Sequence, residues 1–465
     1  MEFYGLKVAG IPSAILSFVK KPVIVILIIG LIIRLVLAPF FTYDFDMKGW
    51  ALVIENINSG NGLYDLAGYY YTPVWGYFIG LLSTVQDLFL NINVLGIRFT
   101  DLLPIESLQC VYHTATTTTV SFNLSMKFPL MLCDVLVGYL IYWLIKDRTN
   151  GDSKKATWGF ALWFLCPTII YMSGIQAQFD TLSALLLMLT IIAFYKDRCF
   201  LGGMLFAMAT LTKFFPAFCI FVFAAYIIVK HRDDKLVLRK LLMTVLGGSL
   251  MALAIMMPQI LDGTVSDAMS FMFGRMETYP NLLVATHSVF GMIVSVLGAF
   301  YFGYRMYKTD QKDADTKLFD YLLFALTAAM MLSVTPQYMI VMMPMLIFKI
   351  MTSDRGYLIC WILISLGSFF AALSINNFSL LTSSGEFLNI VSPEWIISMM
   401  QGFETEFLGF TGMVWANAIS EIVEYIGLIL ILAFCFEKWI GKHSPKAKIC
   451  IERIKRIGWK KDHEI

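Results

Sequence analysis

VIVILIIGLIIRLVLAPF, at residues 23–40, has one charged side chain, Arg34, in eighteen positions. A helix needs about 20 mostly apolar residues to cross the hydrocarbon core of a membrane. The run is too long for the apolar core of a secretory signal, and it has no small-residue cleavage site. It therefore predicts a first membrane-spanning helix that the protein retains.

The composition of the whole chain agrees with a membrane protein. Of 465 residues, 58% are hydrophobic and 15% are charged, whereas a soluble domain carries roughly 25% charged residues. This excludes a soluble globular enzyme, a disordered chain and a small disulfide scaffold. The net charge of +2 gives no case for a nucleic-acid partner. No two of the eight cysteines have Cys-x-x-Cys spacing, so a zinc site or a structural disulfide is not expected.

Apolar runs predict about twelve spans in an all-α bundle, with residues 1–437 as the membrane domain and 438–465 as a basic tail. The expected spans are 22–40, 127–145, 157–173, 181–195, 201–212, 214–229, 241–258, 287–304, 318–334, 337–349, 357–374 and 420–437. Lysine and arginine gather in alternate linkers, at 146–155, 196–198, 230–240, 305–317 and 349–355. By the positive-inside rule these linkers are cytoplasmic, which predicts a multi-pass cell-membrane protein with both termini inside.

The segment 41–126 is then one large external loop. Residues 73–90 in this loop are apolar enough to suggest another span, but a full crossing there would invert every later basic linker. Gly76, Gly80 and Asp87 also interrupt the run. We therefore expect residues 73–90 to form a re-entrant or interfacial helix.

An acidic pair, Asp44 and Asp46, follows the first span. In an extended segment, residues two apart face the same side. A carboxylate at the outer edge of the membrane can act as a general base on a hydroxyl or can hold a divalent ion. A solvated loop turn is the alternative.

Aromatic residues crowd the same loop, with Tyr71 and Trp75 in the run YYYTPVW at residues 69–75. They can form a platform for an acceptor or a lipid. The alternative is an aromatic belt at the membrane interface.

Polar groups at the other external linkers are further candidates. Gln178 and Asp180 can hydrogen-bond sugar hydroxyls, although Asp180 can instead cap the next helix. Lys213, where two half-helices meet near Pro216, can bind a lipid phosphate or can extend its ammonium to the interface.

The remaining candidates are scattered along the chain. Asp134, inside the second span, is either functional or paired with another buried polar group. Side chains that can grip a phosphate or lend polar contacts are Lys127, Arg275, His287 and Gln337.

The order of these motifs resembles that of membrane glycosyltransferases with the GT-C fold. The similarity is to the glycosylphosphatidylinositol mannosyltransferase I catalytic subunits and to bacterial and archaeal polyprenyl-phosphate mannosyltransferases. It rests on DFD at 44–46, YYYTPV at 69–74, DVLVGYLIY at 134–142, QFDTL at 178–182, TKFFP at 212–216 and PQY at 336–338. It covers roughly residues 40–345.

The resemblance implies transfer of a sugar, mannose above all, from a polyprenyl-phosphate donor to a lipid, glycan or protein hydroxyl at the external face. Asp46 or Asp44 would be the base. Lys213, Arg275, Gln178, Asp180, Lys127 and His287 would bind the donor, and Tyr71, Trp75 and Gln337 the acceptor or lipid. No cofactor is expected, and no essential metal. The alternatives are a transporter or lipid flippase and a non-catalytic scaffold.

Overall fold

The computed structural model describes most of the chain, and for some residues the backbone alone. The described residues are 21–65, 69, 71–89, 97–99, 116–118, 120–269, 282–332, 335–375, 406–407 and 410–457.

Helices make up nearly all of the described structure, as the sequence predicts. In the first half they are α2 (Pro22–Leu37), α3 (Asp44–Asn58), α4 (Pro73–Phe89), α5 (Val120–Arg148), α6 (Ser153–Phe164), α7 (Pro167–Gly174), α8 (Asp180–Tyr195), α9 (Cys199–Thr210), η1 (Phe215–Cys219) and α10 (Ile220–Lys230). The second half contains α11 (Val237–Asp262), α13 (Leu282–Tyr307), η2 (Gln311–Asp313), α14 (Ala314–Met330), η3 (Pro336–Tyr338), α15 (Met339–Thr352), η4 (Arg355–Tyr357), α16 (Leu358–Ile375), α19 (Gly412–Cys435), α20 (Glu437–His443) and α21 (Pro445–Ile457). Two short antiparallel pairs complete it, β1 (Ile97–Phe99) with β2 (Thr116–Thr118), and β3 (Glu406–Phe407) with β4 (Phe410–Thr411).

Each of the twelve expected spans coincides with a helix or a broken helix. Among the described residues, five helices are long and apolar enough to cross a membrane: α5, α11, α13, α16 with η4, and α19. The pair α6 and α7, bent by 50° at Pro167, makes a sixth if it is one span. The number of twelve crossings stays a prediction.

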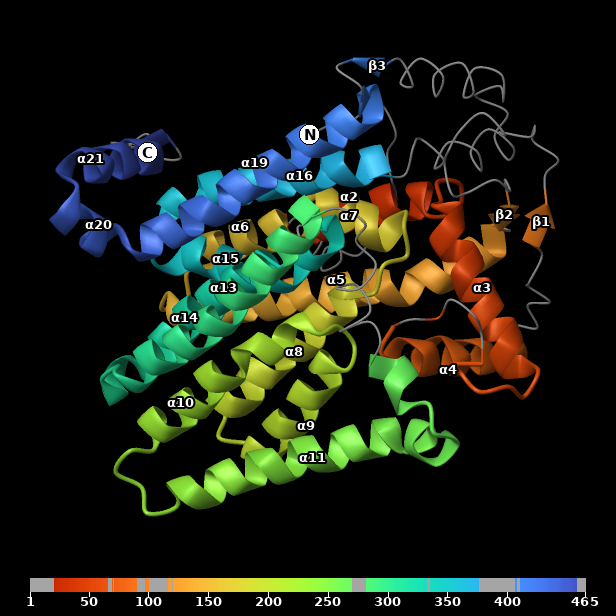
Figure 1. Cartoon of the computed structure of the whole chain (residues 1–465), viewed down its shortest axis with the longest axis horizontal. Helices are drawn as coiled ribbons and strands as arrows, with labels where there is room; N and C mark the ends of the chain where they lie inside the picture. Colours follow the sequence, from red (N-terminus) through yellow and green to blue (C-terminus); the bar gives the residue numbers. More distant parts are fainter. Residues whose placement is uncertain are drawn as a thin grey trace, which may run out of the picture.

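The helices pack as a bundle with buried central members and exposed outer ones. α14 and α15 are buried over most of their length, and the Phe319 and Phe348 rings stack 3.9 Å apart between them. α11 lies along one edge of the bundle (Figure 1) and exposes leucines such as Leu250 and Leu261. An apolar outer surface of this kind suits contact with lipid.

The loop 41–126 begins and ends at the same end of the bundle. Buried contacts join the end of α2 to the start of α5: Asn123 Nδ2 donates to the Pro39 carbonyl at 2.9 Å, and Lys127 Nζ donates to the Ala38 carbonyl at 2.8 Å. The two ends of the loop therefore lie together, and the expectation that residues 73–90 do not cross the membrane stays a prediction. α3 and α4 gather at this end (Figure 1), which we call the loop end.

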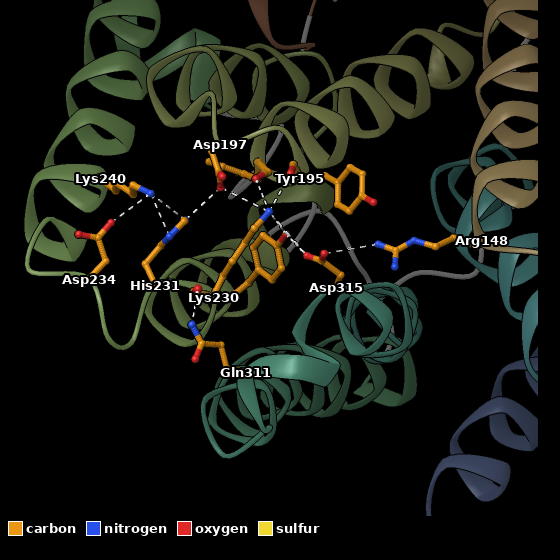
Figure 2. Close-up of polar contacts among 11 residues, drawn as sticks. Arg148, Tyr195, Asp197, Lys230, His231, Asp234, Lys240, Gln311 and Asp315 are labelled. Atoms are coloured by element: carbon orange, nitrogen blue, oxygen red, sulfur yellow. Dashed lines mark hydrogen bonds and ion pairs between the residues drawn. The ribbon is translucent and has the colours of Figure 1, made fainter. Parts of the chain in front are cut away.

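The basic linkers meet at the opposite end, which we call the basic end. Lys230 Nζ lies 3.4 Å from an Asp197 oxygen and 3.6 Å from an Asp315 oxygen, and Arg148 lies 3.8 Å from Asp315 (Figure 2). These contacts join the linkers that follow α5, α8 and α10 to the start of α14. The structure thus confirms that these linkers share one end, and which compartment they face stays a prediction.

Candidate functional site

The acidic pair lies at the start of a helix. α3 begins at Asp44, directly after Tyr43, whose backbone is extended. The segment is helical and not extended, so the condition under which Asp44 and Asp46 would face the same side is not met. The side chain of Asp46 is 8% exposed, so a solvated turn is excluded for it. For Asp44 the structure describes the backbone alone.

The sequence contains a signal for α3 besides its acidic motif. Met47, Trp50, Ala51 and Ile54 recur at helical spacing, and all four are buried. Positions i, i+3, i+4 and i+7 form one apolar face of an α-helix. This face fixes α3 against the bundle and sets Asp46 at its inner edge.

Two glutamine amides hold the Asp46 carboxylate. Gln176 Nε2 donates to Asp46 Oδ2 at 3.0 Å, and Gln178 Nε2 donates to the same oxygen at 2.7 Å. Both glutamines lie between α7 and α8. Gln178 is a predicted site residue, whereas Gln176 is an addition that only the fold supplies.

A left-handed residue lets both glutamines reach one oxygen. Ala177 between them has φ +56° and is fully buried. Residues other than glycine adopt this conformation at a cost of about 1 kcal/mol or more, and such strain collects at functional sites. The strained turn directs two neighbouring amides at one carboxylate.

Burial raises the pKa of Asp46 to about 6. The hydrogen bonds from Gln176 and Gln178 and the charge of Lys213 oppose the rise. A carboxylate with a pKa near neutrality can accept a proton from a substrate and release it again at working pH.

Lys213 is buried beside Asp180. Its ammonium lies 3.3 Å from a carboxylate oxygen of Asp180, and the two side chains are 1% and 0% exposed. The rings of Phe179, Tyr338 and Tyr71 surround the ammonium, with centroids at 4.2, 5.1 and 5.3 Å. The alternative in which Lys213 extends to the interface is therefore wrong.

The position of Asp180 in α8 excludes a role as the helix cap. Phe179 occupies the N-cap of α8 and Asp180 the first turn, so Asp180 is not the cap. With both carboxylates ionised, Asp46, Asp180 and Lys213 carry two negative charges and one positive charge, a sum of −1. A phosphate would therefore have to share Lys213 with Asp180.

Aromatic rings pack around the buried group of Asp46, Asp180 and Lys213, which we call the carboxylate cluster. Trp75 stacks on Phe179 at 4.8 Å, and Trp50 meets both Trp75 and Tyr71 at 5.6 and 5.5 Å. Trp75 is 0% exposed, so the aromatic-belt alternative is wrong for it. The hydroxyl of Thr72 donates to the Thr212 carbonyl at 3.0 Å, which ties this loop to the turn that carries Lys213.

Lys127 donates hydrogen bonds to the end of α2 and the residues after it, none of which belongs to the carboxylate cluster. Its ammonium donates to the carbonyls of Ala38 and Phe41 and to the Thr42 hydroxyl, at 2.8, 2.8 and 3.2 Å. Three acceptors match the three N–H bonds of an ammonium. This geometry gives Lys127 a part in joining α2 to α5, and its predicted contact with phosphate gains no support from it.

The structure says less about three other candidate residues. Gln337 is half-buried in η3, next to the Tyr338 whose ring faces Lys213. Arg275 lies outside the described residues, as does the side chain of His287. Their predicted roles stay predictions.

Asp134 is paired with another buried polar group, which is the second of the two alternatives considered for it. Arg34 Nε lies 2.9 Å from Asp134 Oδ2, both side chains are fully buried, and the hydroxyl of Ser173 also donates to that oxygen. Asp134 therefore joins α2, α5 and α7 as a structural ion pair.

Neither a scan against protein-family models nor a search of curated proteins gave a match for this chain. The site unites the loop, the α7–α8 linker, the α9–η1 turn and η3 around one buried carboxylate. Such a site can take a proton from a bound hydroxyl and hold an apolar or sugar ring against its aromatic side chains.

Proposed function

We propose that this protein is a membrane glycosyltransferase. It moves a sugar, with mannose the first candidate, from a polyprenyl-phosphate donor to a hydroxyl of a lipid, glycan or protein acceptor. The reaction takes place at the external face of a cell membrane and inverts the anomeric centre. The observation that carries the proposal is the environment of the Asp46 carboxylate. Two amides donate hydrogen bonds to it, and burial raises its pKa to about 6.

In the proposed reaction Asp46 takes the proton of the acceptor hydroxyl. The acceptor oxygen attacks the anomeric carbon, and the bond from that carbon to the phosphate oxygen breaks. Polyprenyl phosphate leaves with one more negative charge than the donor had. Proton uptake changes the sum over Asp46, Asp180 and Lys213 from −1 to 0, which offsets the charge that develops on the phosphate.

Phosphate is a good leaving group, so the protein has mainly to orient the two substrates. The rings of Trp50, Trp75 and Tyr71 contact one another, and Trp50 follows Asp46 by one helical turn in α3. These rings would hold the acceptor or the sugar by stacking. Lys213 would contribute positive charge at the phosphate, and the side chains of Asp44, Arg275 and His287 remain candidates for the rest.

A transporter or flippase is less well supported. Transporters concentrate their polar groups near the membrane midplane, at broken helices of a repeat. Here Asp46 and Trp50 belong to α3 and Trp75 to α4, and both helices lie at the loop end of the bundle.

The test is an assay of the purified full chain in liposomes with a panel of radiolabelled polyprenyl-phosphate sugars and a crude lipid, glycan and peptide acceptor mixture. We expect transfer from one donor, with loss of transfer in Asp46→Asn. Folded protein that transfers no sugar from any donor would refute the proposal. Movement of the labelled lipid across the bilayer without transfer would support the transporter instead.

A further inference from the structure

Two carbonyl oxygens in the site are buried and have no hydrogen-bond partner among the described residues. Gln176 Oε1 and Gln178 Oε1 accept no hydrogen bond from any residue that the structure describes. Both amides donate to Asp46 Oδ2, while Asp46 Oδ1 receives no hydrogen bond within the described part of the chain. The site therefore presents three acceptor atoms to whatever binds there.

The directions of the amides follow from their chemistry. An ionised carboxylate only accepts hydrogen bonds, so each glutamine must turn its NH₂ group to Asp46 and its oxygen away. Nitrogen and oxygen of one amide are about 2.2 Å apart by covalent geometry, which places each Oε1 within about 5 Å of Asp46 Oδ2. The three acceptors are thus close enough to meet one small molecule.

Buried donors lie one helical turn along α3 from Asp46, at Trp50, and on the Trp75 ring that contacts it. The indole N–H groups of Trp50 and Trp75 are buried and donate to no described residue, and the two rings are 5.6 Å apart. A hydroxyl both donates and accepts. Neighbouring hydroxyls on one molecule can therefore satisfy acceptors and donors together.

We infer that the acceptor substrate is a polyol, either a sugar or a polyol headgroup with several adjacent hydroxyls, and that Asp46 Oδ1 is the atom that takes the proton. This inference rests on the proposed function. One hydroxyl breaks its O–H bond to Oδ1 as its oxygen bonds to the anomeric carbon, and the polyprenyl phosphate leaves. The neighbouring hydroxyls donate to Gln176 Oε1 and Gln178 Oε1.

The inference separates classes of acceptor. A serine or threonine of a protein brings one hydroxyl, so only its backbone N–H groups could meet the two buried amide oxygens. Unpaired buried acceptors are costly. A sugar or polyol headgroup fills all three acceptors, so the site selects it over a protein hydroxyl.

A protection experiment tests this without the donor. The full chain in liposomes is treated with dicyclohexylcarbodiimide, which reacts with carboxyl groups, and labelling at residue 46 is measured by mass spectrometry. The probes are methyl α-mannoside, myo-inositol and, as the single-hydroxyl control, 1-propanol at equal hydroxyl concentration. Labelling of Asp315, at the basic end, is the internal control.

We expect at least one polyol to slow labelling of Asp46 by about threefold or more, with little effect of propanol and none at Asp315. Gln176→Met and Gln178→Met keep the length of the side chain and remove the amide. Each should need about three to ten times more polyol for the same protection, the effect of one lost hydrogen bond. Gln259→Met, which removes another buried amide outside the cluster, should behave as the unmodified chain does.

Equal protection by propanol, or no protection by either polyol, would overturn the inference. Sugar transfer to a serine peptide in the donor assay, without polyol protection, would overturn it while the proposed function stands. Polyol protection without transfer from any donor would support the inference about the ligand and refute the proposed function.

Discussion

Opposing effects set the proton affinity of Asp46, the base of the proposed reaction. Burial favours its protonated form, while the amides of Gln176 and Gln178 and the charge of Lys213 favour the ionised form. The balance leaves a pKa of about 6. Without the amides the pKa of Asp46 would be higher, and less of the group would be in the ionised form that the proposed reaction needs at neutral pH.

Substitution of Asp46 should therefore remove most of the activity. We expect Asp46→Asn to lower turnover by about 10²–10⁴-fold, the usual contribution of a general base. Asn keeps the shape of the side chain, so thermal melting should show a folded protein. The measurement is single-turnover transfer at saturating donor. Asp44→Asn is the matched control and should have a smaller effect, and a turnover of Asp46→Asn within about threefold of the unmodified chain would refute the role of Asp46 as base.

The pH dependence of transfer gives a second view of the same residue. The ionised carboxylate is the active form, so kcat/KM should fall as pH drops below about 6 and should level off above it. In Gln178→Met the midpoint should move to higher pH, because a hydrogen bond that favours the ionised form is lost. A profile that is flat between pH 5 and 8 would contradict this assignment.

The Lys213–Asp180 pair should behave as a buried ion pair. Removal of one partner takes the opposite charge away from the other, and breaking a buried ion pair typically costs about 3–5 kcal/mol. We expect Lys213→Met alone to lower the melting temperature strongly, and the double variant Lys213→Met with Asp180→Asn to regain much of it. If both proteins melt alike, the two charges are not coupled.

At the scale of elements, close helix contacts depend on residues without side chains. A Cβ atom on Gly247 in α11 would lie 2.1 Å from the Phe200 carbonyl oxygen of α9, whereas one on Gly248 would come no closer than 3.4 Å to the Gly203 carbonyl oxygen. α9 and α11 therefore touch through backbone, as membrane helices do where small residues meet.

This difference yields a matched pair of variants. Gly247→Ala should destabilise the protein by about 1–3 kcal/mol, the usual cost of overpacking, because backbone rather than a flexible side chain blocks the new methyl group. Gly248→Ala, one residue along the same helix, should be nearly neutral. Melting in detergent compares the two, and equal losses would show that the contact can relax.

At the scale of the whole molecule, the ion pairs of Figure 2 gather the basic linkers at one end, away from α3 and α4. Cys450, an exposed residue of α21, belongs to the same end, because Lys455 of that helix lies 2.9 Å from Asp354 in a basic linker. Positions at the two ends should therefore be accessible from opposite sides of the membrane.

Labelling of intact cells with an impermeant maleimide tests this arrangement. An engineered cysteine at Ser153 and the native Cys450 should stay unlabelled until the membrane is opened, whereas a cysteine at Asn61, in the exposed turn after α3, should react at once. Labelling of Ser153→Cys from outside would invert the topology and would place the candidate site in the cytoplasm.

The sequence by itself determined the apolar helices and the common side of the basic linkers, because both depend on local composition. It also indicated which motifs carry polar groups, since Asp46, Gln178, Asp180 and Lys213 stand out against apolar neighbours. These features need no knowledge of contacts between distant residues.

Only the tertiary structure decided how these groups pair. Residues 46, 178, 180 and 213 come from three separate segments, and nothing local in their motifs says that Gln176 joins Gln178 on one oxygen of Asp46 or that Lys213 pairs with Asp180. The same holds for Asp134, a candidate in sequence and a partner of Arg34 in space. The physical reason is that a buried charge takes its role from the group that meets it, and the packing of the helices chooses that group.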